Sequence, residues 1–197
     1  MLITLVIVGI IAAMTIPTLI NKTNKQELVS KLKKAYSTLS QATNRIIADE
    51  GKPRADIGGW ATTSEVIFNM YKNYLNGAKD CSLSTNCFEG SYLMLNKTTK
   101  NFTSHLAFVM SDGTEVTIWG HNDSCSAYGN GSSGICALII VDVNGIKKPN
   151  IIGQDTFGFV LKQDGLLPQG CDSNACTGSE EGFGCTCKVL REGAINY

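Results

Sequence analysis

The chain has 197 residues, a formal net charge of zero from 17 basic and 17 acidic residues, and eight cysteines. This length suits one domain with an attached segment. The balanced charge gives no general attraction to nucleic acid, so we expect no nucleic-acid partner. The two histidines, His105 and His121, lie in no nucleophile motif, and the chain has no phosphate-loop or dinucleotide fingerprint, so we expect no enzymatic activity.

An uncharged apolar run occupies residues 1–20, and eleven of its residues are Leu, Ile or Val. Such residues favour membrane insertion by about 0.3 to 0.6 kcal/mol each, and the run is just long enough to span a bilayer as a helix. It lacks the basic region and the cleavage site of a secretory signal. A domain of this size offers little interior for a helix that is apolar on all sides. The run therefore predicts a membrane or assembly helix.

A helical pattern continues over residues 21–50. Six apolar residues recur at spacings of four and three, which places them on one helix face. They are Leu28, Leu32, Ala35, Leu39, Ala42 and Ile46. Lysines and other polar residues occupy the other faces, and residues 51–53 end the pattern. As one helix, residues 1–50 would be about 75 Å long, with the second half packed on a sheet.

Residues 51–197 predict one globular head that contains helices and strands. A helix is expected over residues 60–75, because Thr62 and Glu65 have capping-box spacing and apolar residues follow at helical intervals. Asn76 and the glycine after it would end this helix. Strands dominate the rest of the head.

Two alternating runs, residues 105–110 and 114–119, flank a Ser-Asp-Gly turn and predict a β-hairpin. Residues 135–141 are apolar without alternation and predict a central strand, and residues 157–161 predict another. The Gly-, Ser- and Asn-rich residues 120–134 predict a surface loop. The fold class is therefore α+β, with an antiparallel sheet.

The cysteines form an even set among Gly, Ser and Asn, which is typical of disulfides made in an oxidising compartment. They are Cys81, Cys87, Cys125, Cys136, Cys171, Cys176, Cys185 and Cys187. Spacing pairs Cys81 with Cys87, and Cys125 with Cys136.

The last four cysteines lie in a Cys-rich region, residues 165–190. Cys185 and Cys187 are too close for an unstrained mutual bond, so we expect them to pair with Cys171 and Cys176, in an order that the spacing leaves open. A zinc site on these four residues is the alternative, but the Cys-x-x-Cys pair usual in such sites is missing.

A short acidic motif raises the question of calcium. Asp142 and Asn144 stand two apart before a glycine, as in the first part of a calcium loop, and Asp155 follows further on. Two lysines follow at a point where another acidic residue would help to bind calcium, and the final Glu of an EF-hand is missing. A plain β-turn is the favoured interpretation. We therefore expect no cofactor, with calcium at Asp142, Asn144 and Asp155 as the alternative.

The N-terminal segment resembles the N-terminal helix of type IV pilins and type II secretion pseudopilins, from just after its start. A glycine and then a proline stand at spacings similar to those of the family, and a basic amphipathic extension follows. The resemblance covers about the first quarter of the chain. It assigns membrane and assembly contacts to Leu2, Ile3, Leu5, Val6, Ile7, Val8, Gly9, Ile10, Ile11, Ile16 and Pro17.

Family members carry a basic leader that ends in Gly and is cleaved before a methylated Phe, with a Glu shortly after it. None of these features is present, so we expect that the sequence lacks its natural N-terminus and could not be processed as given. A lost leader would also explain why lysines after residue 20 favour the cytoplasm while the cysteines favour an oxidising compartment. An in-frame leader in the DNA upstream of Met1 would support this expectation.

The resemblance implies a structural subunit of a type IV pilus or a type II secretion pseudopilus. Residues 1–20 would hold it in the bacterial inner membrane with an extracytoplasmic head, and the same helices would pack in a periplasmic or cell-surface fibre. Its partners would be other pilin or pseudopilin subunits, the membrane and the inner-membrane assembly machinery. The family also suggests a disulfide-closed C-terminal loop and, in some pseudopilins, calcium in this half of the head. A non-polymerising, membrane-anchored extracytoplasmic binding or adhesion domain is the alternative.

Overall fold

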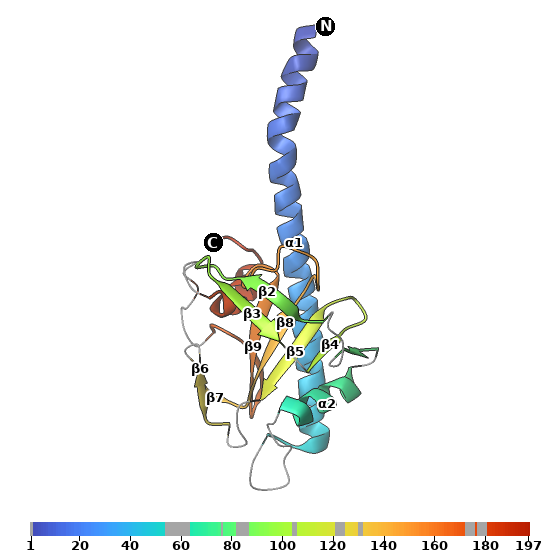
Figure 1. Cartoon of the computed structure of the whole chain (residues 1–197), viewed down its shortest axis with the longest axis vertical. Coiled ribbons are helices and arrows are strands. Elements are labelled where there is room, and N and C mark those ends of the chain that lie inside the picture. Colours follow the sequence, from blue (N-terminus) through green and yellow to red (C-terminus); the bar gives the residue numbers. More distant parts are fainter. Residues whose placement is uncertain are drawn as a thin grey trace.

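One long helix, α1 (Leu2–Glu50), projects from a head that contains all the strands (Figure 1). The computed structural model describes residues 2–53, 64–75, 77–81, 87–103, 106–120, 125–129, 132–171, 176 and 181–197. The expectation that residues 1–50 form a single helix is confirmed from residue 2 onward. The helix ends at Gly51, whose φ of +85° suits glycine and whose N–H donates to the Ile47 carbonyl oxygen at 3.1 Å.

The second half of α1 packs on the head through the predicted face. Its buried side chains recur at helical spacing and are Val29, Leu32, Ala35, Leu39, Ala42 and Ile46, with Leu28 partly buried beside them. The ring of Tyr36 stacks on Phe159 of the sheet, with ring centroids 5.5 Å apart. The prediction that this stripe covers a sheet is confirmed.

A second helix, α2 (Ser64–Tyr74), covers the same side of the sheet and buries Ile67, Phe68 and Tyr71. Its predicted capping residue, Thr62, lies outside the described residues. A buried hydrogen bond of 2.5 Å joins the Tyr71 and Thr43 hydroxyls, so α2 is tied to α1 by a polar contact inside the core.

The Thr43–Tyr71 bond gives a first testable prediction. Thr43→Val leaves the buried Tyr71 hydroxyl without this partner, and we expect a loss of about 1 to 3 kcal/mol. Tyr71→Phe should cost less, because the Thr43 hydroxyl still donates to the Leu39 carbonyl oxygen. The double variant should recover part of the Thr43→Val loss. Urea denaturation of all four proteins measures the coupling, and strictly additive losses would contradict it.

The main sheet has six antiparallel strands in the order β1-β4-β5-β8-β9-β10. Their bounds are β1 (Lys79–Asp80), β4 (Ala107–Val109), β5 (Glu115–Gly120), β8 (Ala137–Asp142), β9 (Thr156–Lys162) and β10 (Gly165–Pro168). The predicted hairpin is β4–β5, with Phe108 opposite Val116. The predicted central strand is β8, which lies between β5 and β9. Both predictions are confirmed, and β10 is an additional edge strand.

Two small ribbons lie outside this sheet: β2 (Glu89–Leu93) pairs with β3 (Thr99–Thr103), and β6 (Ala127–Gly129) pairs with β7 (Ser132–Ile135). The prediction that residues 120–134 form only a surface loop is therefore wrong in part. Gly is depleted in strands, but the neighbouring Cys125–Cys136 disulfide brings the two segments together. The composition of these residues therefore did not indicate that β6 and β7 pair as strands.

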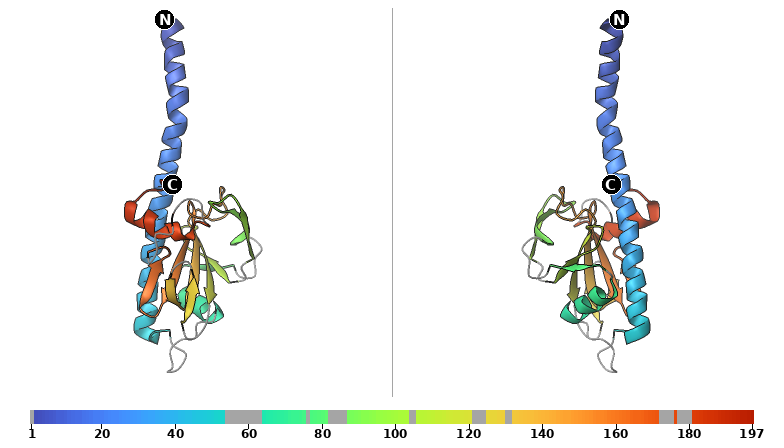
Figure 2. Two further views of the ribbon diagram at one scale, coloured as in Figure 1. Left: turned by 90° about the vertical axis from the view of Figure 1, so that its left-hand side faces the viewer. Right: turned by 90° about the vertical axis from the view of Figure 1, so that its right-hand side faces the viewer.

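The sheet is buried on both faces. Phe108, Val116 and Ile139 face the core shared with α1 and α2. Ala107 and Ile140, their neighbours in sequence, face a second core on the opposite side, as alternation along a strand requires. Figure 2 shows β2 and β3 on the side of the sheet away from α1. That second core contains an aromatic cluster made of Phe88, Tyr92, Phe102, Trp119 and Phe183.

Four disulfides use all eight cysteines, namely Cys81–Cys87, Cys125–Cys136, Cys171–Cys187 and Cys176–Cys185. The two pairs predicted from spacing are confirmed, and the open order in the Cys-rich region is settled as nested. No thiol remains for the alternative zinc site. The nested pair holds a 3-10 turn, η1 (Phe183–Cys185), and α3 (Thr186–Glu192) against the sheet.

Candidate functional sites

The N-terminal half of α1 projects beyond the head (Figures 1 and 2), and the large apolar side chains described there are exposed. Its large exposed side chains, with their exposed fractions, are Val6 58%, Ile7 50%, Ile10 52%, Met14 72%, Ile16 53%, Leu19 65% and Ile20 52%. Gly9 is exposed as well. The side chains of Leu2, Ile3, Leu5, Val8, Ile11 and Pro17 lie outside the described set. Apolar patches of this kind usually mark a surface that another molecule covers.

Among the side chains that the structure describes, no helix combines the length and the apolar character needed to cross a bilayer.

The C-terminal tail contacts α1 where the helix leaves the head. The Lys25 ammonium donates to the Ile195 carbonyl oxygen at 3.2 Å, and Asn21, Val29 and Ala194 line a groove at this place. This contact ties the first turns of the buried part of α1 to the end of the chain.

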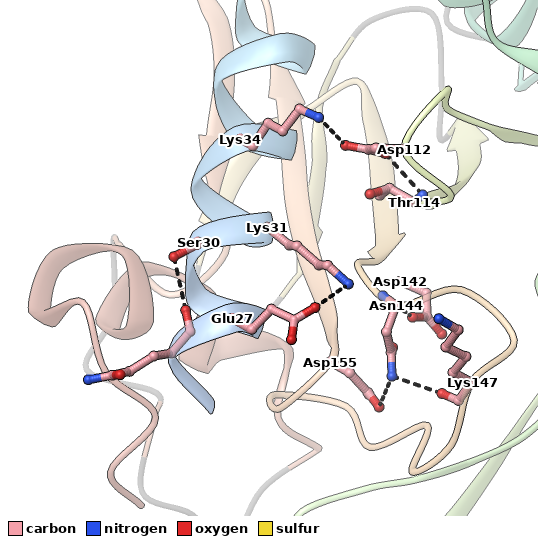
Figure 3. A network of polar contacts seen from close by, with 11 residues as sticks. Glu27, Ser30, Lys31, Lys34, Asp112, Thr114, Asp142, Asn144, Lys147 and Asp155 are labelled. Atoms are coloured by element: carbon pink, nitrogen blue, oxygen red, sulfur yellow. Dashed lines mark hydrogen bonds and ion pairs between the residues drawn. The ribbon is translucent and has the colours of Figure 1, made fainter. Parts of the chain in front are cut away.

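The predicted calcium candidates lie together in a second site, the loop between β8 and β9. Asp142 ends β8 and Asp155 directly precedes β9, so the strand pairing sets the two carboxylates at the same end of the sheet. Both side chains are fully buried, and Asn144 is partly buried between them. Figure 3 shows the three side chains converging beside the loop, with Lys147 next to them.

Hydrogen bonds hold this loop in a defined shape. The Asn144 N–H donates to Asp142 Oδ1 at 3.1 Å, and the Ile151 N–H donates to Asp155 Oδ1 at 2.6 Å. The Asn144 side-chain amide donates to the Lys147 carbonyl oxygen at 2.8 Å and lies 3.5 Å from Asp155 Oδ2. The first contact is one that a plain Asx turn also makes, so it fits either of the two interpretations from sequence.

The electrostatics of the loop are unfavourable for two carboxylates. Burial, and next the charge of Asp155, raise the pKa of Asp142 to about 8. Burial also raises the pKa of Asp155 and of Glu115, which lies opposite Asp142 in the β5–β8 register. A buried carboxylate whose pKa rises has lost water without gaining enough positive charge in return.

Sequence patterns did not indicate three further members of this site. Glu115 reaches it through strand pairing, Tyr92 through a side-chain hydrogen bond with Asp142, and Asn150 through its place just before the last turn of the loop. Strand pairing brings in Glu115 and a long-range contact brings in Tyr92, so neither leaves a local pattern in the sequence. Asn150 lies in the same loop as Asn144, so its place in the sequence is the one local signal that could have found it.

Among the described residues, no group of three or more His, Cys, Asp or Glu side chains could hold a metal ion. His105 and His121 lie outside those residues. Comparisons with protein-family models, with curated proteins and with solved structures found no match to this chain.

Proposed function

We propose that the chain is a structural subunit that assembles into a helical fibre, either a type IV pilus or a type II secretion pseudopilus, through the N-terminal half of α1. The observation that supports this proposal is the two-part burial of one continuous helix. Residues 29–46 of α1 bury one face on the head, whereas the large apolar side chains that the structure describes between Val6 and Ile20 are exposed.

The energetics require that this surface be covered. Full burial of one Val, Leu or Ile side chain stabilises by about 1.5 to 3 kcal/mol relative to exposure to water. Leaving the exposed apolar residues of α1 in water would therefore cost roughly 10 kcal/mol or more, compared with covering them by lipid or by neighbouring helices. Because the head is fixed to the same helix, packing of these helices would place the heads on the outside of a fibre.

Storage before assembly is the second part of the proposal. The uncharged residues 1–20 would rest in the inner membrane with the head in the extracytoplasmic space, where the four disulfides can form. Assembly would then exchange lipid contacts for contacts between helices. The free energy of this step would come from helix packing and not from the hydrophobic effect. The partners would be other copies or related subunits and the inner-membrane machinery that extracts them.

A charge placed in the exposed apolar surface tests the proposal. We expect Ile10→Asp to lower the amount of chain in the sedimented fibre fraction of producing cells at least tenfold, because a carboxylate would be buried between helices without a partner. Ile146→Asp is the matched control, since Ile146 is 70% exposed but lies on the head. It should leave incorporation unchanged.

Two outcomes would count against this function. Incorporation of the Ile10→Asp chain at the wild-type level would show that the surface is not an assembly contact. A wild-type chain that stays in the membrane fraction and enters no fibre would instead support the anchored binding or adhesion domain.

A further inference from the structure

Two neighbouring grooves follow α1 where the helix leaves the head. The first has a volume of about 320 Å³ and lies between α1 and the C-terminal tail, with a lining that includes Lys22, Lys25, Val29, Ala194 and Ile195. Figure 2 shows the C-terminus next to α1 at this point. The second has a volume of about 380 Å³ and is lined by Thr15, Ile16, Leu19 and Lys22 on the projecting half of the helix. Lys22 borders both grooves, so the two meet at this residue.

The lining of the two grooves forms one stripe along α1. Its members stand at spacings of four, three, four and three, which places them on one helix face. They are Thr15, Leu19, Lys22, Gln26 and Val29. Leu19 is 65% exposed, whereas Val29 is buried against the head. The stripe therefore changes from apolar to basic at Lys22, just after the uncharged run ends.

The basic part of the stripe carries positive charge without a matching carboxylate. Lys22 and Lys25 have exposed side chains, and no ion pair joins either of them to a carboxylate of the described residues. Lys31, further along α1, is instead paired with Glu27 at 2.9 Å. The bond from the Lys25 ammonium to the Ile195 carbonyl oxygen uses one N–H group and holds this ammonium at the groove. Its other N–H groups can bind an anion.

We propose that one anionic phospholipid binds at this junction. Its phosphate would lie between the ammonium groups of Lys22 and Lys25, and an acyl chain would follow the apolar groove beside Leu19. The inference rests on the proposed storage of residues 1–20 in the membrane. Lysines are attracted to anionic headgroups, and their apolar stems can lie along a membrane helix while the ammonium stays in the polar layer.

Only an amphiphile with a negative headgroup fits both grooves. A free phosphate would leave Ile16 and Leu19 without a partner, although these side chains are 53% and 65% exposed. A zwitterionic lipid would bring a cation of its own close to the two ammonium groups. A bound anionic lipid would set the height of the head above the bilayer until the helix is extracted. It would also give a role to lysines that, by the positive-inside rule, disfavour an extracytoplasmic head.

Titration of the full chain in dodecyl maltoside with short-chain lipids tests the proposal. Native mass spectrometry should show one bound dioctanoyl phosphatidylglycerol. Dioctanoyl phosphatidylcholine has the same acyl chains and should bind at least tenfold more weakly. Inorganic phosphate at the same concentrations should not displace the anionic lipid. Lys22→Gln combined with Lys25→Gln should weaken phosphatidylglycerol binding at least tenfold, and arginine at both positions should restore it.

Two further variants separate a specific site from general charge attraction. Lys52→Gln combined with Lys79→Gln is the matched control, because it removes the same charge from exposed positions away from the grooves. It should bind phosphatidylglycerol as the wild type does. Ala194→Phe keeps both groove lysines but fills the space between the tail and α1, and it should lose the lipid as the lysine variant does.

Several results would overturn the lipid site. They are equal affinity for the two lipids, an equal loss in the Lys52 and Lys79 control, wild-type binding by Ala194→Phe, and displacement of the lipid by phosphate alone. Flotation of the wild type with phosphatidylcholine vesicles separates this inference from the proposed function. A chain that floats but shows no lipid preference overturns the headgroup site alone, whereas a chain that does not float overturns membrane storage as well.

Discussion

Gly170→Ala should prevent the Cys-rich C-terminal region from closing and should cost about 3 kcal/mol or more. Gly170 has a φ of +86°, and a Cβ atom there would overlap the carbonyl oxygen of Gly184 and lie 2.6 Å from its carbonyl carbon. Both obstructing atoms belong to the backbone, so no side chain can move aside. The close approach holds Gly170 next to the two nested disulfides that follow it.

Gly113→Ala isolates the contribution of this contact. Gly113 has the same φ of +86°, but a Cβ there would meet no atom within 4 Å. Its cost should be limited to the left-handed backbone, about 1 to 2 kcal/mol. Urea denaturation and titration of free thiols after oxidative refolding measure both effects. Equal losses in the two variants, or full disulfide formation in Gly170→Ala, would contradict the prediction.

Local periodicity predicted the elements that depend on a single stretch of sequence. The buried stripe from Leu32 to Ile46 follows from helical spacing, and the β4–β5 hairpin follows from alternation around a turn. Cys81–Cys87 and Cys125–Cys136 close short loops, so spacing alone identified them. These features need no knowledge of distant partners.

The elements that sequence reasoning missed depend on distant partners. The β2–β3 hairpin buries only a few side chains of its own, such as Tyr92 and Phe102, and Phe102 packs against Trp119 and Phe183 from far along the chain. The order of the C-terminal disulfides depends on a contact between distant segments, in which the Cys187 N–H donates to the Gln169 carbonyl oxygen at 3.0 Å. Neither contact leaves a periodic signal in the sequence.

The candidate sites divide in the same way. The apolar half of α1 was predictable because it is apolar on all sides, and a domain of this size has too little interior to bury such a helix. Asp142, Asn144 and Asp155 were identified as candidates by their spacing. Their burial depends on how β8 and β9 pair, which their spacing in the sequence does not show.

Phe102→Ala should be among the most destabilising substitutions in the head, at about 3 to 5 kcal/mol. The Phe102 side chain is almost fully buried, at 1% exposed. Its ring centroid lies 5.0 Å from that of Tyr92, 5.5 Å from that of Phe88 and 5.7 Å from that of Trp119. Truncation would leave a cavity between the β2–β3 hairpin and the main sheet, which chemical denaturation would detect as a lower free energy of unfolding.

Phe68→Ala is the comparison in the other core: Phe68 is 3% exposed between α2 and the sheet and contacts Phe108 instead. It should cost similar stability. A free energy of unfolding equal to that of the wild type in Phe102→Ala would contradict the prediction.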